Sequence, residues 1–458
     1  MPKVVDNTKH TVEKVKVNNK SRKAIIGIIY IAMLIDYLLT TCVVPIVPDF
    51  LIKLWTADGT LHLKSNGTVD YSEISIPVGL LFGSKSVVQI IFNFIAGPLT
   101  NHIGYSVVMF SGFALIAAST ITFMLSKAYW MLFVARSVQG IGSALTVTAG
   151  LGLAAKMYTE ESERGRAIGA VLGGLALGGV IGPSYGGILY EYGGIMLPLG
   201  ILAVLAMIDG LLQAIVLRPK LEKEEVKGTK IGTLMTDPYI LITSGAIFIS
   251  NLGISVLQPT LPLWMIRQWN SSSAQQGMIF FPCTFGYLIN SQIFGSLAHK
   301  FGRWRSSIAG LGLIAAAGTI IPFCPNIYFL IVPVAITGLG IGIVDSTMFP
   351  MLGTIVDKRH SQAYGSVFGI GDSAVCLAFA VGPFLAGPLV RIIGFKYTIW
   401  CMAASNLLYA PILFLLQKIE TTKKEEVVER QTTFTIDNKR FSEIGNPSNQ
   451  SLNSLSFN

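Results

Sequence analysis

The sequence predicts an all-α integral membrane protein with twelve transmembrane helices in two six-helix halves. Three observations predict this class. Of the 458 residues, 52% are hydrophobic and only 13% are charged, and the mean hydropathy is +0.60, whereas soluble domains are about 25% charged. The apolar runs are long enough to cross a bilayer as helices and lack the alternation of barrel strands. One pattern of glycines and prolines occurs in both halves of the chain.

Each predicted span is an apolar stretch of about 20 residues or more. In chain order the spans are 25–50, 76–98, 105–126, 128–155, 166–190, 195–217, 239–266, 276–298, 306–325, 327–354, 363–390 and 395–417. They define an N-terminal bundle, 25–217, and a C-terminal bundle, 239–417. The remaining segments are an N-terminal tail (1–24), a first loop (53–75), a central linker (218–238) and a polar C-terminal tail (418–458) that we expect to be disordered.

The basic residues predict the orientation in the membrane. Lys and Arg gather in the N-terminal tail and in alternate short loops, as the positive-inside rule expects of cytosolic segments. Both tails and the linker are therefore expected in the cytosol, and the net charge of +9 does not indicate nucleic-acid binding. Loop 53–75 is then luminal. Asn66 and Asn270 begin N-glycosylation patterns in predicted luminal loops and are the expected acceptors.

The internal repeat divides the spans six and six. The matched positions are Gly97 and Gly104 with Gly295 and Gly302, Gly165 and Gly169 with Gly365 and Gly369, Gly182-Pro183 with Gly382-Pro383, and Pro45-x-x-Pro48 with Pro259-x-x-Pro262. Each copy keeps its place within its half. Transporters built from parallel repeats rock their halves about a site near the bilayer midplane, so this pattern favours transport. Pro45 and Pro48 are also expected to break the first span near its end.

Six ionisable residues lie within predicted spans: Asp36, Lys85, Arg136, Asp209, Asp345 and Asp372. Charges at that depth must pair, be neutralised or line water, and they usually mark a substrate or ion path. We interpret Asp36, near the middle of the first span, as the counter-ion of a cationic solute. The alternative is a structural partner for Lys85. Arg136 either tunes nearby acids or locks the halves together, and Asp209 is interpreted as structural.

Asp345 and Asp372 are the candidate proton carriers. Their repeat partners are Leu145 and Leu172, so these carboxylates are additions to one half rather than parts of the shared scaffold. A carboxyl group in a low-dielectric site can load and release protons near neutral pH. The alternative for either residue is a permanently protonated acid that bonds to a neighbouring helix.

Neutral polar and aromatic residues complete the candidate set. Asn251 and Gln258 lie two turns apart on one face of the seventh span, where solute contact and interhelical hydrogen bonding are nearly equal alternatives. Phe82, Trp264 and Tyr287 could surround an amine by cation–π attraction, although packing is the default role of an aromatic side chain. Gly295 and Gly302 bound a tight turn that is expected to hold one state by contacts between the halves.

No pattern indicates an enzyme. No nucleophile–base set or metal-binding spacing occurs, and the five cysteines lie within or near apolar spans as small hydrophobes. We therefore expect no metal and no cofactor, with a proton gradient as the driving force.

Several motifs resemble those of the vesicular amine transporter family, within the major facilitator superfamily, over all twelve spans. They are Asp36 with Val44-Pro45-Ile46-Val47-Pro48, Leu80-Leu81-Phe82-Gly83-Ser84-Lys85, Ala135-Arg136-Ser137-Val138-Gln139-Gly140, Val344-Asp345-Ser346, Val356-Asp357-Lys358-Arg359-His360 and, as an antiporter motif, Gly182-Pro183. The family exchanges luminal protons for cytosolic amines. The resemblance implies the major facilitator fold, with Asp36 on the amine nitrogen and Lys85 regulating access. It implies a central site of Phe82, Arg136, Leu175, Asn251 and Tyr287, and proton coupling at Asp345 and Asp372.

The chain departs from the family in four respects, which concern the seventh span, the residue after Asp36, the eleventh span and the first loop. Gln258 and Tyr37 replace a glutamate and an asparagine, and Phe368 and Phe379 replace tyrosines. Loop 53–75 is short and has no cysteine, so the family's luminal disulfide cannot form. The site is expected to be less acidic and less polar than in other members.

The expected function is proton-coupled antiport of cationic monoamines, of the serotonin, dopamine, histamine and noradrenaline class. The monomer would move them by alternating access from the cytosol into acidic secretory or synaptic vesicles. The first alternative is transport of acetylcholine, or a broader amine or drug:proton antiporter, because a quaternary nitrogen depends on aromatic contacts. The second is a receptor-like protein that binds an amine without moving it.

Overall fold

The computed structural model describes residues 19–57, 71–158, 160–217, 229–271, 275, 278–360 and 363–419. The first half comprises α1 (Asn19–Ala57), α2 (Tyr71–Ile103), α3 (Tyr105–Met124), α4 (Tyr129–Met157), α5 (Glu161–Gly193) and α6 (Met196–Val216). The second comprises α7 (Ile231–Thr236), α8 (Pro238–Trp269), α10 (Phe281–Phe301), α11 (Arg303–Ile320), η1 (Ile321–Phe323), α12 (Ile327–Arg359), α13 (Tyr364–Tyr409) and η2 (Ala410–Leu416). The described residues contain no strand, and the predicted all-α class is confirmed.

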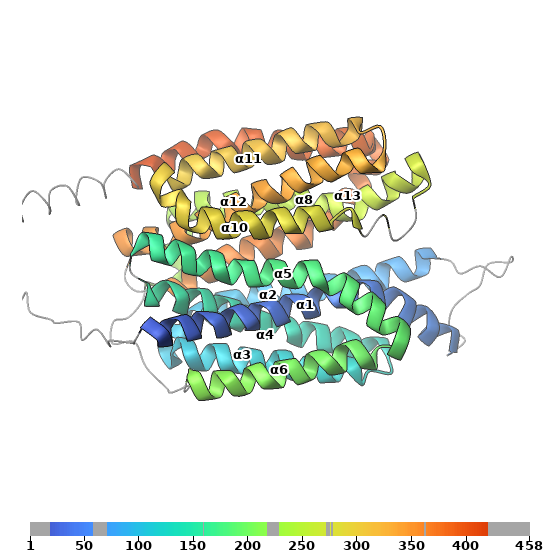
Figure 1. The fold of residues 1–458 in the computed structure, drawn as a ribbon, viewed down its shortest axis with the longest axis horizontal. Helices are drawn as coiled ribbons and strands as arrows, with labels where there is room; N and C mark the ends of the chain where they lie inside the picture. Colours follow the sequence, from blue (N-terminus) through green and yellow to red (C-terminus); the bar gives the residue numbers. More distant parts are fainter. Residues whose placement is uncertain are drawn as a thin grey trace, which may run out of the picture.

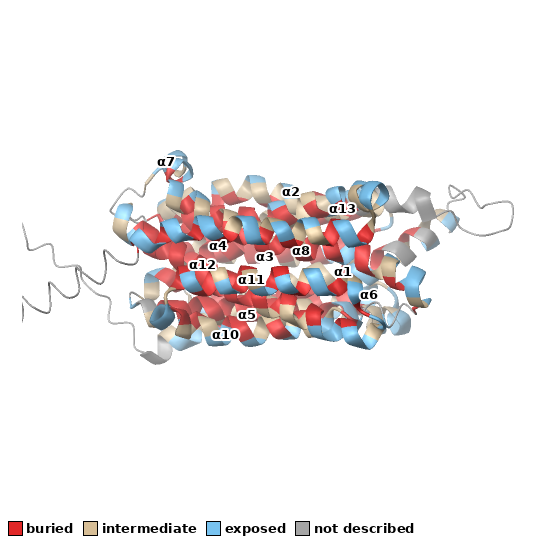
Figure 2. Ribbon diagram, turned by 90° about the horizontal axis from the view of Figure 1, so that it is seen from above, coloured by how far each residue is buried: buried red, intermediate tan, exposed pale blue. Residues whose placement is uncertain are grey.

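The two halves lie side by side as separate bundles, the blue-to-green helices largely below the yellow-to-red ones (Figure 1). We call the end where α1 begins, α6 ends and α8 begins the linker end, and the opposite end the far end. Buried residues gather inside the assembly and exposed apolar residues cover its outer helices (Figure 2). This distribution fits a protein whose outer surface faces lipid.

The described helices account for all twelve predicted spans. Ten segments are long and apolar enough to cross a membrane. One of them, Tyr364–Ile419, contains two spans, because Gly394 has non-helical angles inside α13. The remaining span is α10, which is not among these ten segments and carries the polar run Asn290-Ser291-Gln292 in its middle.

The first helix is longer than expected and is not interrupted. α1 continues through Pro45 and Pro48 to Ala57, so the predicted break is wrong. A proline removes one backbone hydrogen bond, and neighbouring helices can compensate for that loss inside a membrane bundle. α1 and α2 also extend into the predicted loop 53–75 from both sides.

The internal repeat appears in the backbone. Gly104 starts the turn from α2 to α3 with φ +92°, and its partner Gly302 starts the turn from α10 to α11 with φ +95°. L-residues rarely adopt this region, because their Cβ atom collides with the backbone. The same tight turn is therefore required once in each half.

Two repeat-related helix pairs join the halves, α5 with α10 and α2 with α13. A Cβ atom added to Gly295 of α10 would lie 2.7 Å from the carbonyl oxygen of Gly165 of α5. In the related helix pair, a Cβ atom added to Gly369 of α13 would lie 2.7 Å from the carbonyl oxygen of Asn93 of α2. Backbones approach this closely only where glycine has no side chain, so the repeated glycines build the contact between the halves.

The halves are closest at the linker end. Along α5, a Cβ atom at Gly169 would lie 2.5 Å from the carbonyl oxygen of Ser291, whereas one at Gly179, nearer the far end, would lie 3.7 Å from Thr284. Among the described residues, α1 and α8 do not pack closely against each other. The structure therefore shows the two halves closed at the linker end and diverging toward the far end.

Candidate functional site

Asp36 lies in the middle of α1 and is 3% exposed. Its Oδ1 atom accepts a hydrogen bond of 2.6 Å from the hydroxyl of Ser143 on α4. No ion pair within 4.0 Å joins it to a cation in the described part of the chain. A buried carboxylate without a fixed counter-charge is suited to receive a cation.

Lys85 and Arg136 both bind Thr40 instead of an acid. The Nζ atom of Lys85 donates to the Thr40 hydroxyl at 2.7 Å, and Nη2 of Arg136 donates to the Thr40 carbonyl at 3.0 Å. Arg136 also donates to Gln139 at 2.5 Å and stands over the ring of Phe82, 5.6 Å from its centroid. The alternative of a direct Lys85–Asp36 ion pair is thus not realised in this conformation.

Asp372 on α13 is held by the amides of α2. Its Oδ2 atom accepts hydrogen bonds from Gln89 at 2.8 Å and Asn93 at 2.7 Å, and the thiol of Cys376 lies 3.8 Å away. Both amides come from the first half and the carboxyl from the second. The protonation of Asp372 is therefore linked to the contact between the halves.

Asp345 on α12 bonds only within the second half. Its Oδ1 atom accepts from Asn251 of α8 at 3.1 Å, and its Oδ2 atom accepts from the hydroxyl of Tyr287 of α10 at 3.2 Å. The side chain is 3% exposed. The structure thus brings together three residues that were predicted from separate spans.

The other predicted site residues divide into two groups. Leu175 and Phe82 are half-buried on α5 and α2, and Gln258 is exposed two turns beyond the buried Asn251 on α8. Trp264 lies in a separate cluster toward the far end, with ring centroids 4.8 Å from Trp269 and 4.7 Å from Phe395. Trp264 thus packs against aromatic side chains of its own half.

Asp209 lies apart from the other acids, on the outer helix α6. It is buried, and its Oδ2 atom accepts from Gln213 on the same helix at 2.7 Å. Asn270 is exposed at the end of α8 with φ +49°, while Asn66 lies outside the described residues.

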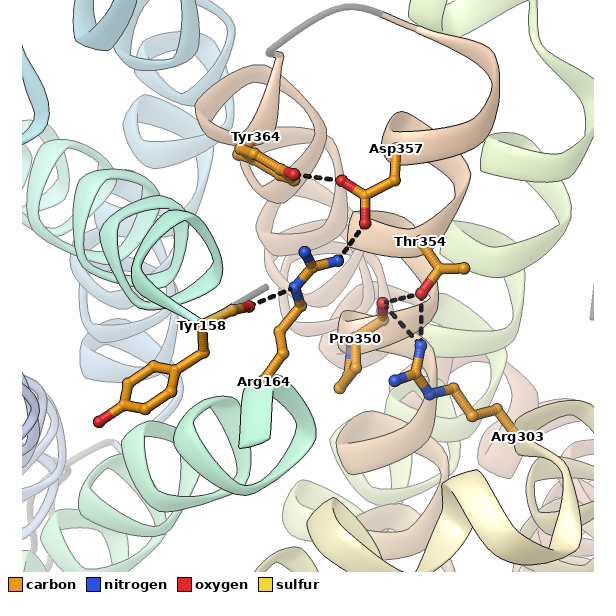
Figure 3. Close-up of polar contacts among 7 residues, drawn as sticks. All are labelled: Tyr158, Arg164, Arg303, Pro350, Thr354, Asp357 and Tyr364. Carbon is orange, nitrogen blue, oxygen red and sulfur yellow. Dashed lines mark hydrogen bonds and ion pairs between the residues drawn. The ribbon is translucent and has the colours of Figure 1, made fainter. Parts of the chain in front are cut away.

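Arg164 connects the halves at the linker end (Figure 3). Its Nη1 atom lies 2.5 Å from Oδ2 of Asp357 on α12, and its Nε atom donates to the Tyr158 carbonyl at 3.0 Å. The hydroxyl of Tyr364 bonds to the other oxygen of Asp357. Nearby, Arg303 binds Thr354 at 2.6 Å within the second half, so this basic residue of a predicted loop is in fact buried.

Asp237 forms a second linker-end cluster inside the second half. Its carboxylate caps α8 through the amide of Tyr239 at 2.9 Å and accepts from Arg359 and His360, each at 2.8 Å. Burial alone would raise the pKa of Asp237, but these hydrogen bonds outweigh it and hold the pKa below its usual range.

Sequence reasoning missed Thr40, Ser143, Gln89 and Asn93. A signal was present for two of them, because Lys85, Gln89 and Asn93 follow one another at intervals of four residues along α2, and such residues share a helix face. Thr40 and Ser143 gave no such signal, since hydroxyls commonly bond to their own helix in membrane spans.

No group of three His, Cys, Asp or Glu side chains among the described residues could hold a metal ion. The arrangement instead offers three buried carboxyls, two buried cations and neutral hydrogen-bonding groups. This set can exchange protons and bind a cation.

Comparison with known proteins gives consistent matches over most of the chain. The model of the Major Facilitator Superfamily matches residues 29–247 and 243–448. The chain is 38% identical to the human chromaffin granule amine transporter over 88% of this chain and 89% of that protein. It is also 38% identical to the human synaptic vesicular amine transporter, over 87% and 89%.

Two further matches are less similar. Identity to a probable vesicular acetylcholine transporter of Danio rerio is 35% over 91% of this chain and 83% of that protein. Among solved structures, the human organic anion transporter MFSD10 superposes with a TM-score of 0.72 at 18% identity, over 86% of this chain and 99% of that chain. This likeness concerns the fold.

Proposed function

Because this chain belongs to the vesicular amine transporters of the major facilitator superfamily, we propose that it exchanges luminal protons for a cytosolic monoamine across a vesicle membrane. Its cytosolic side would be the linker end. The relatives named as chromaffin granule and synaptic vesicular amine transporters share more identity with it than the relative named as a probable vesicular acetylcholine transporter does.

The observation that carries the proposal is the charge balance of the buried site. Among the described residues, the buried charged side chains of the predicted site are three acids, Asp36, Asp345 and Asp372, and two fixed cations, Lys85 and Arg136. If all three acids are ionised, one positive charge is missing. A protonated amine at Asp36 or a proton on one of the acids can supply that charge. If the amine and the proton were bound together, the buried site would carry one uncompensated positive charge, which is unfavourable. The amine and the proton can therefore each balance the same negative charge, but not at the same time, and this alternation is what an exchanger requires.

Exchange also requires two conformations. The closure at the linker end corresponds to the state open to the lumen under the proposed orientation. Protons arriving from the lumen would load Asp345 and Asp372, and loading Asp372 changes its bonds to Gln89 and Asn93 of the other half. Protonation can thereby favour one arrangement of the halves over the other, as linkage demands.

Uptake of labelled serotonin into acidified proteoliposomes tests the proposal. We expect accumulation that a protonophore abolishes, and its loss in Asp36→Asn, which keeps the shape of the side chain but cannot pair with a cation. Gln258→Glu is expected to increase uptake by restoring an acid on α8. Asp209→Asn is a matched control, since that acid lies outside the site.

Two outcomes would contradict the proposal. Accumulation of acetylcholine but not serotonin would assign the chain to the quaternary amines. Saturable serotonin binding without protonophore-sensitive accumulation would indicate a protein that binds an amine without moving it.

A further inference from the structure

The hydroxyl of Thr40 uses all of its hydrogen-bonding capacity. A threonine hydroxyl has one donor and two acceptor positions. Here it donates to the carbonyl of Asp36 at 2.9 Å and accepts from Lys85 at 2.7 Å and from the amide of Gln139 at 3.2 Å. Its own helix and α4 thus fix its orientation, leaving one lone pair aimed at the ammonium of Lys85.

Thr40 lies one turn after Asp36 on α1, about 6 Å farther along the helix axis. The carbonyl of Thr40 also accepts a hydrogen bond from Arg136 at 3.0 Å. Both cations of the site therefore donate hydrogen bonds to the same neutral residue. Asp36 keeps only the hydroxyl of Ser143 as its side-chain partner among the described residues.

A neutral hydroxyl is an unusual choice of partner for a buried ammonium near acids. Lys85 is 6% exposed and lies within electrostatic reach of Asp36 and Asp372. Opposite charges attract strongly where water is excluded. Yet no ion pair within 4.0 Å forms between Lys85 and either acid. Some contact must hold the ammonium elsewhere, and the hydrogen bond to Thr40 is that contact.

We propose that Thr40 is a positioning residue that holds the Lys85 ammonium away from Asp36 and so keeps this carboxylate available to a substrate ammonium group. The inference rests on the proposed function, since it explains how the amine site stays unoccupied by the protein's own cation. Without the hydroxyl, Lys85 would turn to Asp36, and an incoming amine would have to displace it.

The test compares Thr40→Val, which has the same shape without the hydroxyl, with Thr40→Ser, which keeps it. We expect Thr40→Val to raise the Kd for serotonin and the KM for its uptake about tenfold, the effect of one hydrogen bond to a charged group, with a smaller change in kcat. Thr40→Ser should stay within about twofold of the unmodified chain. Thr120→Val is the matched control, because the buried hydroxyl of Thr120 bonds to its own helix at Ile116.

A second comparison separates positioning from packing. In a Lys85→Met background no ammonium competes for Asp36, so adding Thr40→Val should leave serotonin binding unchanged. A packing defect would weaken binding equally in both backgrounds. Binding is measured on purified protein, because Lys85→Met can abolish transport for other reasons, and thermal unfolding confirms that each variant is folded.

The outcomes are distinct. Binding by Thr40→Val equal to that of the unmodified chain, or an equal loss in the Lys85→Met background, overturns the role of Thr40 alone. If the unmodified chain neither binds nor accumulates serotonin, the proposed function fails, and this inference fails with it.

Discussion

Arg164 of α5 and Asp357 of α12 join the two halves of the protein by an ion pair of 2.5 Å at the linker end. The guanidinium group is 2% exposed and the carboxylate 33%. Removing one partner of a pair in which the other is buried is strongly unfavourable. The closed linker end shown here therefore depends on both residues.

Asp357→Asn is expected to open the linker end. The buried Arg164 would lose its counter-charge, at a cost of up to about 3–5 kcal/mol for a fully buried pair and less here because Asp357 is partly exposed. Spin labels at the exposed positions Glu160 and Lys300, in a cysteine-free background, report the separation of the halves. We expect longer distances in the variant. Thr354→Val removes the hydrogen bond between Arg303 and Thr354 within the second half, so it should leave the distances unchanged. Equal distances in Asp357→Asn and in the unmodified chain would show that this ion pair does not hold the linker end closed.

Gly165→Ala is expected to prevent the observed closure. The added Cβ atom would overlap the carbonyl of Gly295, and neither backbone can yield without separating α5 from α10. We expect serotonin uptake to fall at least about tenfold, since overpacking typically costs about 1–3 kcal/mol. Gly187→Ala on the same helix meets nothing within 4 Å and should leave uptake unchanged. Normal uptake in Gly165→Ala would show that the glycine contact is dispensable.

Asp237 should make the free energy of unfolding depend on pH in the acidic range. Its pKa in the folded protein is lowered, so its contribution to stability is fully present above its unfolded pKa of about 3.9 and is lost as the pH falls through the folded pKa. At pH 7, the Asp237→Asn variant should unfold at a lower temperature, because the loss of the carboxylate's hydrogen bonds lowers the free energy of unfolding by about 1–3 kcal/mol. The difference between variant and unmodified chain should shrink as the pH falls below about 4. Melting curves between pH 3 and 7 measure this, and a constant difference would contradict it.

Both the fold and the family could be predicted from the sequence. Helix length and hydropathy predicted the spans, and the glycine repeat predicted which positions recur, such as Gly165 with Gly365. The same repeat positions form the contacts between the halves in the structure. The proline prediction failed at Pro45 because a local rule cannot include the neighbours that support the helix.

The sequence also selected the buried acids, but not their partners. The partners of Asp345 are Asn251 and Tyr287, which come from two other helices. The partners of Asp372 are two amides of α2, which lie across the interface between the halves. The sequence offered Lys85 as an alternative partner of Asp36, because opposite charges in a membrane attract. In the structure the ammonium group of Lys85 donates to the hydroxyl of Thr40 instead.

By itself the sequence determined the membrane class, the duplicated architecture and the list of charges that lipid cannot tolerate, because these follow from composition and spacing along one chain. Only the tertiary structure decided which end is closed and which neutral groups hold each charge. Those choices depend on side chains such as Thr40 and Ser143, whose hydroxyls can bond either to their own helix or to another. The outcome is fixed by which helix lies opposite, and that information is spread over the whole chain.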